Sequence, residues 1–281
     1  MMTLIVIFSI ILLVYVMIIR GRVGEKNLED LRYWVYAHRG LHDKPFVPEN
    51  SMLAFQRALD RGYGIELDVH LLKDGGLAVI HDSSLKRTAG ADVNIEDLTL
   101  DQLQNYHLEG TTETIPTFRQ VLNLYNGQAP LIIELKAANG NAAKLAEAVC
   151  NALKTYHGPY GIESFDPRCL LWLKRNRPDV IRGQLSQNFM KNPSGQGRLI
   201  DFILTFLLGN LLTKPDFVAY KFEDRKNLSN LLCLYLWRMQ GASWTITKQE
   251  NFETCAQEGL LPIFEQFEPK VFFEESKPLV N

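Results

Sequence analysis

Imidazole, guanidinium and carboxylate side chains are concentrated between residues 38 and 82 of this 281-residue chain. In chain order the motifs are His38-Arg39-Gly40, Glu49-Asn50, Glu66-Leu67-Asp68, Lys73-Asp74-Gly75 and His81-Asp82. Carboxylates can hold a hard cation, and a cation and an arginine can neutralise phosphate charge. Two imidazoles can move protons on opposite sides of a phosphorus atom. Hydrolysis of a phosphodiester uses such a set of residues.

Three carboxylates are the candidate ligands of a cation. Glu66 and Asp68 are two residues apart in an expected strand, so their side chains share one face. Two neighbouring carboxylates repel each other unless a cation or a proton lies between them. Glu134 follows an apolar run and is expected to be buried as a third ligand, the alternative being an ion pair with Lys136. Lys136 would offer a positive charge to a phosphate oxygen.

His38 and His81 are the candidates for general acid and base. Each stands beside a charged residue at an expected strand end, near the paired carboxylates. Which of them is the acid is left open, as is the attacking group, either water or a substrate hydroxyl. Glu49 is a further candidate for the metal shell, although its position before a helix also suits a cap residue. The other histidines are expected at the rim (His42) or in ordinary structural or surface positions (His70, His107 and His157).

The elements that must position these side chains alternate along the chain. The expected strands lie at residues 34–37, 64–71, 77–80, 131–135, 160–165, 180–185, 217–220, 243–247 and 261–264. The expected helices lie at residues 51–59, 116–125, 141–156, 167–176, near 198–212, at 228–239 and between the last two strands. This alternation indicates a parallel sheet, and its length and repetition favour an α/β fold of the closed (β/α)8 TIM-barrel type. Nine strands are one too many, and the 73–76 turn is too short for a parallel crossover, so one arm of that hairpin is expected to be antiparallel.

The candidate residues fall where a barrel would bring them together. His38, Glu66 with Asp68, and Glu134 with Lys136 lie at or near the C-terminal ends of successive expected strands, which face the active site in this fold. In the hairpin, Asp68 and His81 are almost equally far from the turn, so pairing would place them roughly opposite each other. Two aromatic residues at strand ends, Phe165 and Trp244, would either line the substrate site or pack at the barrel mouth.

The N-terminal segment differs from the rest of the chain. Residues 3–19 are almost wholly apolar and are followed by Arg20-Gly21-Arg22. No basic residue precedes the run and no small-x-small site follows it, which favours a retained helix over a cleaved signal peptide. Residues 1–22 are therefore expected to be a transmembrane anchor, residues 23–32 a juxtamembrane linker and residues 33–281 the phosphodiesterase barrel.

Basic residues flank the apolar run on its C-terminal side only, at Arg20, Arg22, Lys26 and Arg32. By the positive-inside rule, this places the barrel on the cytoplasmic side of the cell membrane, attached by a single pass. Four widely spaced cysteines without a C-x-x-C pair are expected to be buried free thiols, which suits a reducing compartment. The formal net charge of −2 and the lack of a basic block interleaved with aromatics argue against nucleic acid as a partner. The oligomeric state is left open.

An ordered series of short motifs resembles the glycerophosphodiester phosphodiesterase family, densely over residues 35–166 and more thinly beyond. The motifs are His38-Arg39-Gly40, Pro48-Glu49-Asn50-Ser51, Ala54-Phe55, Gly64-Ile65-Glu66-Leu67-Asp68-Val69, Lys73-Asp74-Gly75, His81-Asp82, Leu85-Lys86-Arg87-Thr88, Ile115-Pro116-Thr117, Ile133-Glu134-Leu135-Lys136, Ser164-Phe165-Asp166 and Trp244-Thr245-Ile246-Thr247. The resemblance implies a TIM-barrel enzyme that needs a divalent cation, Ca²⁺ or Mg²⁺. It also implies the reaction, hydrolysis of a glycerophosphodiester to glycerol 3-phosphate and an alcohol.

Carried over residue by residue, the resemblance assigns the site. His38 and His81 match the acid/base pair, and Arg39 with Lys136 match the phosphate contacts. The metal ligands are matched by Glu66, Asp68 and Glu134, with Glu49 near that shell.

Two features depart from the family pattern. Thr247 stands where Asn or Asp is more common, and residues 199–212 are unusually apolar for a barrel helix. The apolar segment suggests a second membrane contact or a buried helix. Two rival functions follow: hydrolysis of lysophospholipids by a phospholipase D or C reaction, and a non-catalytic barrel that binds head groups. The second rival is disfavoured because binding alone needs no acid/base pair.

Overall fold

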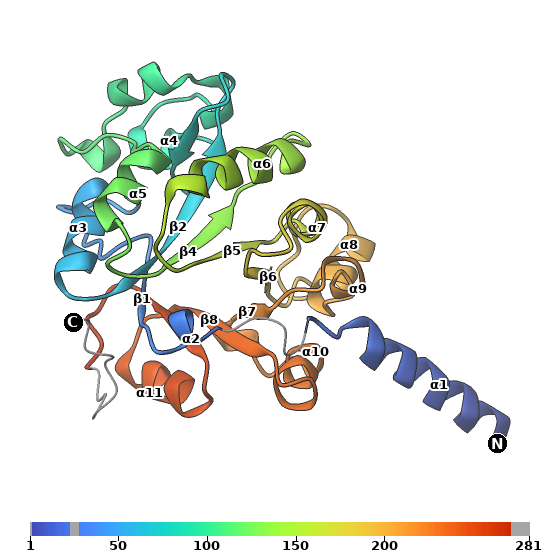
Figure 1. Ribbon diagram of the computed structural model, residues 1–281. Coiled ribbons are helices and arrows are strands. Elements are labelled where there is room, and N and C mark those ends of the chain that lie inside the picture. The colour runs from blue at the N-terminus through green and yellow to red at the C-terminus, as the bar shows by residue number, and fades with distance from the viewer. Residues whose placement is uncertain (1, 23–27, 271–281) are drawn as a thin grey trace.

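The computed structural model describes residues 2–22 and 28–270. Within them, nine strands form one sheet that closes on itself, because β1 pairs with both β2 and β9. All neighbouring strands are parallel except β2 and β3, so eight parallel strands close the expected (β/α)8 barrel (Figure 1). The barrel strands are β1 (Tyr36–His38), β2 (Gly64–Leu71), β4 (Leu131–Leu135), β5 (Tyr160–Ser164), β6 (Arg182–Ser186), β7 (Phe217–Lys221), β8 (Gln240–Ile246) and β9 (Leu261–Phe264).

The extra strand of the sequence prediction is β3 (Leu77–Val79), which pairs antiparallel with β2. Val69 lies opposite Val79, and the Ile80 amide donates to the Asp68 carbonyl. His81 therefore follows one position beyond the residue opposite Asp68, close to the predicted register. Residues 72–115 continue from this hairpin as an insertion with its own apolar cluster, which includes Leu85, Ile95 and Leu103. The insertion holds His81 and Asp82 at one side of the barrel mouth.

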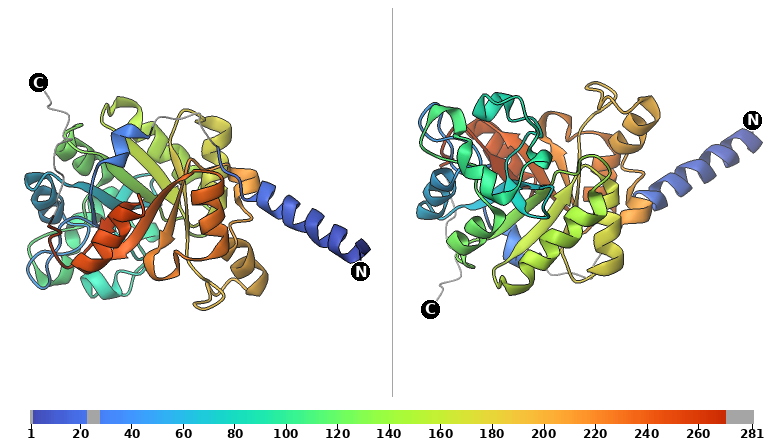
Figure 2. Two further views of the ribbon diagram at one scale, coloured as in Figure 1. Left: turned by 90° about the horizontal axis from the view of Figure 1, so that it is seen from below. Right: turned by 90° about the horizontal axis from the view of Figure 1, so that it is seen from above.

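Helices cover the outside of the barrel (Figures 1 and 2). Their bounds are α1 (Met2–Ile18), α2 (Glu29–Arg32), α3 (Met52–Asp60), α4 (Lys86–Ala89), α5 (Phe118–Tyr125), α6 (Ala142–Ala152), α7 (Pro167–Asn176), α8 (Arg198–Thr205), α9 (Asn210–Thr213), α10 (Leu228–Leu231) and α11 (Gln249–Gln257). An outer apolar layer joins the strands to these helices, and an inner cluster that includes Tyr36, Ile132 and Phe217 fills the barrel below the site. The strands are thus buried on both faces, as the nearly continuous apolar runs of β4, β7 and β9 predict.

The helix expected near residues 198–212 is broken into α8 and α9. Leu207, between them, has a φ of 56°. The Thr205 carbonyl accepts hydrogen bonds from the hydroxyls of Tyr220 and Ser229. These tertiary contacts end α8, so the apolar composition alone did not predict the break. Similarly, the helix expected at 228–239 is α10 followed by a π-helical turn over Leu232–Leu236.

The N-terminal apolar run forms α1, which projects away from the barrel in all three views (Figures 1 and 2). Its C-terminal end is fixed by Asn210, whose Nδ2 donates to the Ile19 carbonyl at 2.9 Å, and by Trp237, whose Nε1 donates to the Val16 carbonyl at 2.9 Å. Across the described ranges, no helix has both the length and the apolar character needed to cross a bilayer.

The expected linker over residues 23–32 is only partly visible, because residues 23–27 lie outside the described residues, as do residues 271–281 at the end of the expected barrel domain. Within that linker, Leu28 and Leu31 are buried in the inner barrel cluster. The barrel core therefore includes part of the segment expected to be a linker.

Candidate active site

A small cavity of about 90 Å³ lies at the mouth of the barrel. Its walls come from the C-terminal parts of the strands, where the sequence predicts the site. The lining residues are His38, Arg39, Glu66, His81, Glu134, Glu163, Phe165, Leu185, Trp244, Thr245 and Ile263. The cavity therefore brings together both predicted histidines, two of the three predicted metal ligands, one of the predicted phosphate contacts and both predicted aromatic residues.

Three carboxylates converge beside this cavity. Glu66, Asp68 and Glu134 each offer an oxygen, and these oxygens lie within 4.8 Å of one another. All three residues are buried. Adjacent parallel strands produce this arrangement, because Asp68 on β2 is in register with Glu134 on β4 while Glu66 precedes Asp68 on the same face.

The charge state of the cluster reflects mutual repulsion. Burial and the charges of Asp68 and Glu134 raise the pKa of Glu66 well above its usual range, and burial also raises the pKa of Glu134. Although burial opposes it, the positive charge of Lys136 leads the effects that hold the pKa of Asp68 far below its usual range. Asp68 Oδ1 is buried and, apart from its ion pair with Lys136, has no hydrogen-bond partner among the described residues. Such a group of crowded, all-oxygen donors fits a hard divalent cation.

Two basic side chains adjoin the cluster. Lys136 Nζ lies 3.0 Å from Glu134 Oε1 and 3.3 Å from Asp68 Oδ1, so the ion pair considered in the sequence analysis is present. Arg39 Nε lies 3.4 Å from Asp68 Oδ2. The opposing carboxylates raise the pKa of both residues despite their burial. Both side chains are therefore cationic and close enough to face a phosphate at the cluster.

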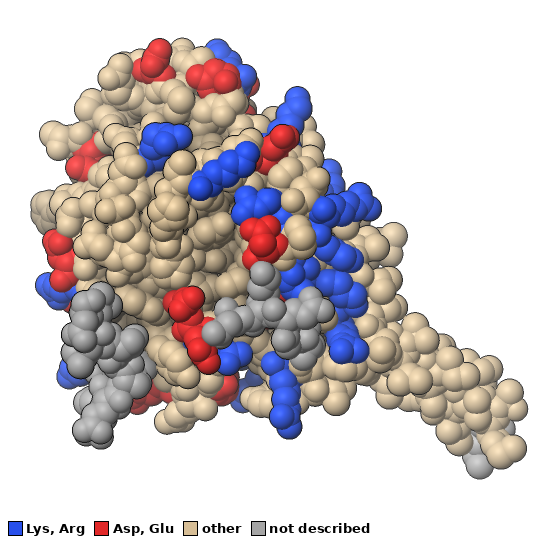
Figure 3. All heavy atoms as spheres, in the orientation of Figure 1, with Lys and Arg blue, Asp and Glu red and all other residues tan. Residues whose placement is uncertain are grey.

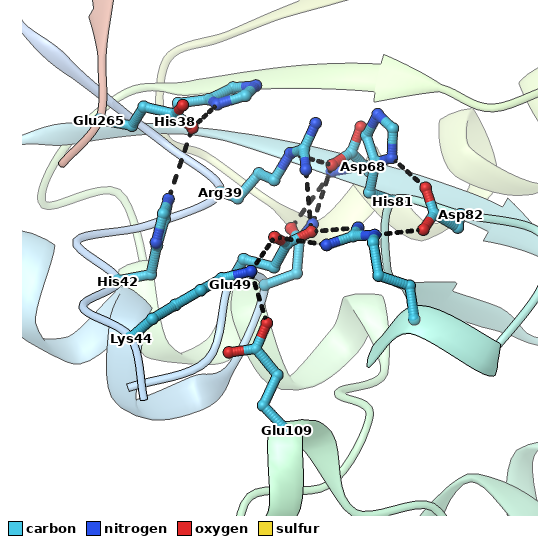
Figure 4. A network of polar contacts seen from close by, with 12 residues as sticks. His38, Arg39, His42, Lys44, Glu49, Asp68, His81, Asp82, Glu109 and Glu265 are labelled. Atoms are coloured by element: carbon cyan, nitrogen blue, oxygen red, sulfur yellow. Dashed lines mark hydrogen bonds and ion pairs between the residues drawn. The ribbon is translucent and has the colours of Figure 1, made fainter. Parts of the chain in front are cut away.

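His38 is oriented by a carboxylate that sequence reasoning missed. Its Nδ1 lies 2.8 Å from Glu265 Oε2 (Figure 4). Its Nε2 lies 3.8 Å from Glu66 Oε2. Burial lowers the pKa of His38, and the hydrogen bond to Glu265 opposes this shift. His42 Nε2 also approaches Glu265, at 3.6 Å. Glu265 directly follows β9, so its position after the last barrel strand was the signal available in the sequence.

His81 is held in the same way. Its Nδ1 lies 2.5 Å from Asp82 Oδ1, and Arg87 holds the other oxygen of Asp82 at 2.6 Å (Figure 4). Burial, together with the charges of Lys136 and Arg39, lowers the pKa of His81 to about 4. His70, expected to be an ordinary residue, is buried and has its Nε2 3.2 Å from the His81 carbonyl. Both candidate imidazoles thus have Nδ1 against a carboxylate, which leaves Nε2 for the cavity.

Glu49 lies in an ion-pair network beside the three-carboxylate cluster. It accepts from Arg39 Nη1 at 2.8 Å and from Arg87 Nη2 at 2.6 Å, and Lys44 Nζ lies 3.6 Å away (Figure 4). These contacts lower the pKa of Glu49 to about 2, although burial opposes the shift. Glu49 therefore positions Arg39. Three cationic side chains surround the Glu49 carboxylate, and its place in the metal shell stays a prediction.

Asn50 acts at the cluster and does not cap the following helix. The side chain of Ser51 accepts from the Ala54 amide and caps α3, while Asn50 Nδ2 donates to Asp68 Oδ2 at 2.8 Å. Asn50 has a φ of 53°, a conformation that asparagine tolerates better than most residues. The contact fixes one oxygen of Asp68.

The opposite wall of the cavity is aromatic. Phe165 makes edge-to-face contacts with Trp244 and with Phe189, at centroid distances of 5.6 Å and 5.9 Å. Both predicted aromatic residues therefore line the site, where they could contact the carbon skeleton of a small substrate. Glu163, on β5 between the two walls, was not predicted, because its carboxylate is preceded and followed by Ile162 and Ser164 in an otherwise ordinary strand pattern.

Comparisons with known proteins agree with this geometry. Residues 38–209 match the glycerophosphoryl diester phosphodiesterase family. The chain belongs to this family. A glycerophosphodiester phosphodiesterase from Caldanaerobacter subterraneus is 35% identical over 169 residues, which cover 57% of this chain and 69% of that protein. Another, from Bacillus altitudinis, is 40% identical over 112 residues, covering 37% of this chain and 45% of that protein.

A solved structure shares the fold. It is a phosphodiesterase from Oleispira antarctica in complex with the product sn-glycerol 3-phosphate, with a TM-score of 0.70 and 22% identity. The match covers 85% of this chain and 95% of that one. At this identity the likeness establishes the barrel architecture and carries no residue assignment.

Proposed function

We propose that the cavity at the barrel mouth hydrolyses glycerophosphodiesters to glycerol 3-phosphate and an alcohol. One observation carries this proposal: two imidazoles with carboxylate-bound Nδ1 atoms line the same cavity as a buried carboxylate cluster. The family to which the chain belongs is named for this reaction, and relatives that bear the same name support the substrate class.

Glu66, Asp68 and Glu134 would hold one divalent cation, for which their hard oxygens favour Ca²⁺ or Mg²⁺ over Zn²⁺. When bound, the cation offsets negative charge on the phosphoryl oxygens. Arg39 and Lys136 add positive charge on the same side of the substrate. Because the side chains of Arg39 and Lys136 are already held beside buried carboxylates, they need little rearrangement to face the negative charge that develops on the phosphoryl group during the reaction.

His38 and His81 divide the proton transfers. One neutral imidazole accepts a proton at Nε2 from the attacking hydroxyl, and the other imidazole donates a proton to the departing alcohol. Glu265 and Asp82 hold the Nδ1 atoms, fix the tautomers and stabilise the imidazolium that forms on each side. The low pKa of His81, about 4, means that its imidazole is neutral near pH 7.

Substrate assays test the proposal directly. Purified protein should release glycerol 3-phosphate from glycerophosphocholine and glycerophosphoethanolamine with added Ca²⁺ or Mg²⁺, and a chelator should abolish the reaction. The same assay with lysophosphatidylcholine tests the lysophospholipase alternative. Hydrolysis of the lysophospholipid without hydrolysis of either glycerophosphodiester would replace the proposed substrate class.

We further propose that residues 1–22 attach the protein to the cell membrane and that residues 199–212 form a second contact. Support comes from the exposed apolar residues of α1 and from Leu199 and Phe202 on α8. An apolar groove of about 450 Å³ lies between these two helices. Lys and Arg side chains gather on the face beside the base of α1, while α1 itself carries no charge (Figure 3). Apolar surface with a basic rim suits an interface with anionic lipid.

The proposed orientation places the barrel on the cytoplasmic side. Arg20, Arg22, Lys26 and Arg32 follow the apolar run, and no basic residue precedes it. The four cysteines are free and buried, which is compatible with a reducing compartment. Protease treatment of intact cells that produce the protein tests the orientation, because digestion of the barrel from outside would contradict it.

A further inference from the structure

Glu163 is a fourth carboxylate in the layer of the barrel that holds the cation cluster. On β5 it is in register with Glu134 of β4, and it lines the same cavity. Only 1% of its surface is exposed to solvent. The mechanism above gives this residue no role.

One oxygen of the Glu163 carboxyl group, the buried Oε2, has no hydrogen-bond partner among the described residues. On the opposite side from Glu134, its strand neighbour is Gly183, which has no side chain to offer and cannot gain one because a Cβ there would collide with Phe217. Lys136 lies close enough to influence the carboxyl electrostatically but pairs with Glu134 and Asp68. Burying a carboxyl oxygen without a hydrogen-bond partner costs free energy, so a polar ligand is the natural candidate to satisfy it.

The surroundings of Glu163 indicate what such a ligand must be. The neighbouring wall consists of Phe165, Leu185, Trp244 and Ile263, which offer apolar surface to carbon atoms. One polar group on an apolar wall beside the cation cluster suits a polyol, because a hydroxyl can hydrogen-bond Glu163 while the carbon chain packs against the aromatic rings.

We propose that Glu163 is a specificity-determining residue that hydrogen-bonds a free hydroxyl of the glycerol moiety. This inference rests on the proposed function, because the phosphate must lie at the carboxylate cluster for glycerol to reach the apolar wall. The carbon skeleton packs against Phe165 and Trp244, and the hydroxyl turns toward Glu163. A carboxyl group makes this bond in either charge state, as an acceptor when ionised or as a donor when protonated. Sites that bond a substrate hydroxyl reject analogues that lack it, because a buried group then loses its partner.

Equilibrium binding to the full-length protein separates this role from a structural one. Isothermal titration calorimetry with saturating Mg²⁺ or Ca²⁺ would use four probes: sn-glycerol 3-phosphate, the phosphates of 1,2-propanediol and 1,3-propanediol, and inorganic phosphate. The two propanediol phosphates each lack one of the glycerol hydroxyls. Glu163→Leu removes the hydrogen-bonding group, and Glu163→Gln keeps one of similar shape.

Glu163→Leu should lower the affinity for glycerol 3-phosphate by about 10- to 100-fold, the range expected for a lost hydrogen bond to a charged or buried partner. The affinity for one propanediol phosphate should fall equally, and the affinity for the other should not change. The probe whose affinity falls carries the hydroxyl that Glu163 binds. Binding of inorganic phosphate should stay within about twofold, and Glu163→Gln should recover most of the affinity. In kinetics with glycerophosphocholine, the loss should appear mainly in KM.

Several results would overturn the inference. An equal loss of affinity for all four probes would show that Glu163 has only a structural role. A tenfold or larger change in cation affinity would make it a metal ligand. Unchanged binding of all four probes would exclude any contact. If the wild-type protein hydrolyses no glycerophosphodiester, the proposed function fails first. If it does so and Glu163→Leu binds glycerol 3-phosphate normally, only this inference fails.

Discussion

At the scale of single residues, each candidate imidazole is controlled by a carboxylate that follows a strand. Asp82 pairs with His81, and Glu265 pairs with His38. The contact raises the pKa of each imidazole relative to a site without the carboxylate. This arrangement explains how two buried histidines keep a defined tautomer.

Asp82→Asn should therefore move one limb of the pH profile. The substitution removes a charge that raises the pKa of His81, which is already lowered to about 4, so that pKa falls further. The limb of the kcat/KM profile that reports His81 should move to lower pH, with kcat reduced by about tenfold. Movement of the acidic limb would make His81 the base, and movement of the alkaline limb would make it the acid.

The matched control for this experiment is Asp92→Asn, because Asp92 is exposed on the same insertion. It should leave both limbs in place. A profile for Asp82→Asn that superimposes on the wild-type profile would show that the pairing with His81 has no catalytic role.

Glu49 gives a residue-scale prediction for stability. Its pKa is lowered from 4.5 to about 2 in the folded protein, so its contribution is complete above pH 4.5 and is lost as the pH falls toward 2. Glu49→Gln should reduce the free energy of unfolding by roughly 1–3 kcal/mol at pH 7. The difference from wild type should shrink in urea titrations at pH 4 and pH 3. Glu147→Gln, at an exposed position on α6, is the control and should show little difference at any pH. A deficit for Glu49→Gln that does not change with pH would contradict the assignment.

At the scale of elements, the sequence predicts strands better than helices. Apolar residues predominate in most of the strands and polar residues stand near their C-terminal ends, so β2 with Glu66 and Asp68 and β4 with Glu134 could be placed. The antiparallel β3 followed from the short turn before it. The break between α8 and α9 could not be predicted, because it depends on hydroxyls of Tyr220 and Ser229 that arrive from later elements.

Long-range contacts also explain which site residues were missed. Glu265 reaches His38 across 227 positions in sequence, and Glu163 meets the cluster only through strand register. Neither has a neighbour in sequence that marks it. By contrast, His38, Asp68 and His81 stand within short sequence motifs, so the sequence alone could mark them as candidates.

The membrane contact is an element-scale prediction. Full-length protein should sediment with vesicles that contain anionic lipid, and a variant lacking residues 1–22 should bind more weakly and with greater sensitivity to salt. Adding Leu199→Asp and Phe202→Asp to that truncated variant should abolish the remaining binding. Leu100→Asp is the control, because Leu100 is an exposed apolar residue on the insertion. If the truncated variant shows no vesicle binding before these substitutions, residues 199–212 are not a membrane contact.

At the scale of the whole molecule, the cation site couples binding to stability. Three buried carboxylates at the barrel mouth repel one another, so a cation that binds only the folded state should stabilise the protein. At one hundred times its Kd, a ligand contributes about 2.7 kcal/mol. For a domain of this size, Tm should rise by roughly 5–10 °C.

Differential scanning calorimetry with Ca²⁺, with Mg²⁺ and with chelator measures this effect. Asp68→Asn should lose most of the cation-dependent increase while remaining folded by circular dichroism. Equal Tm values for the wild-type protein under all three conditions would argue against a cation at this cluster. The larger of the two increases would identify the preferred ion.

The central claim is that His38 and His81 carry out complementary proton transfers on one phosphodiester. The most direct test is kcat for glycerophosphocholine with saturating cation, measured for wild type, His38→Ala, His81→Ala and the double variant. Each single variant should lose at least about 100-fold, the usual cost of removing a general acid or base. The double variant should lose much less than the product of the two single losses, because both groups act on one transition state. Near-wild-type turnover in either single variant would contradict the claim.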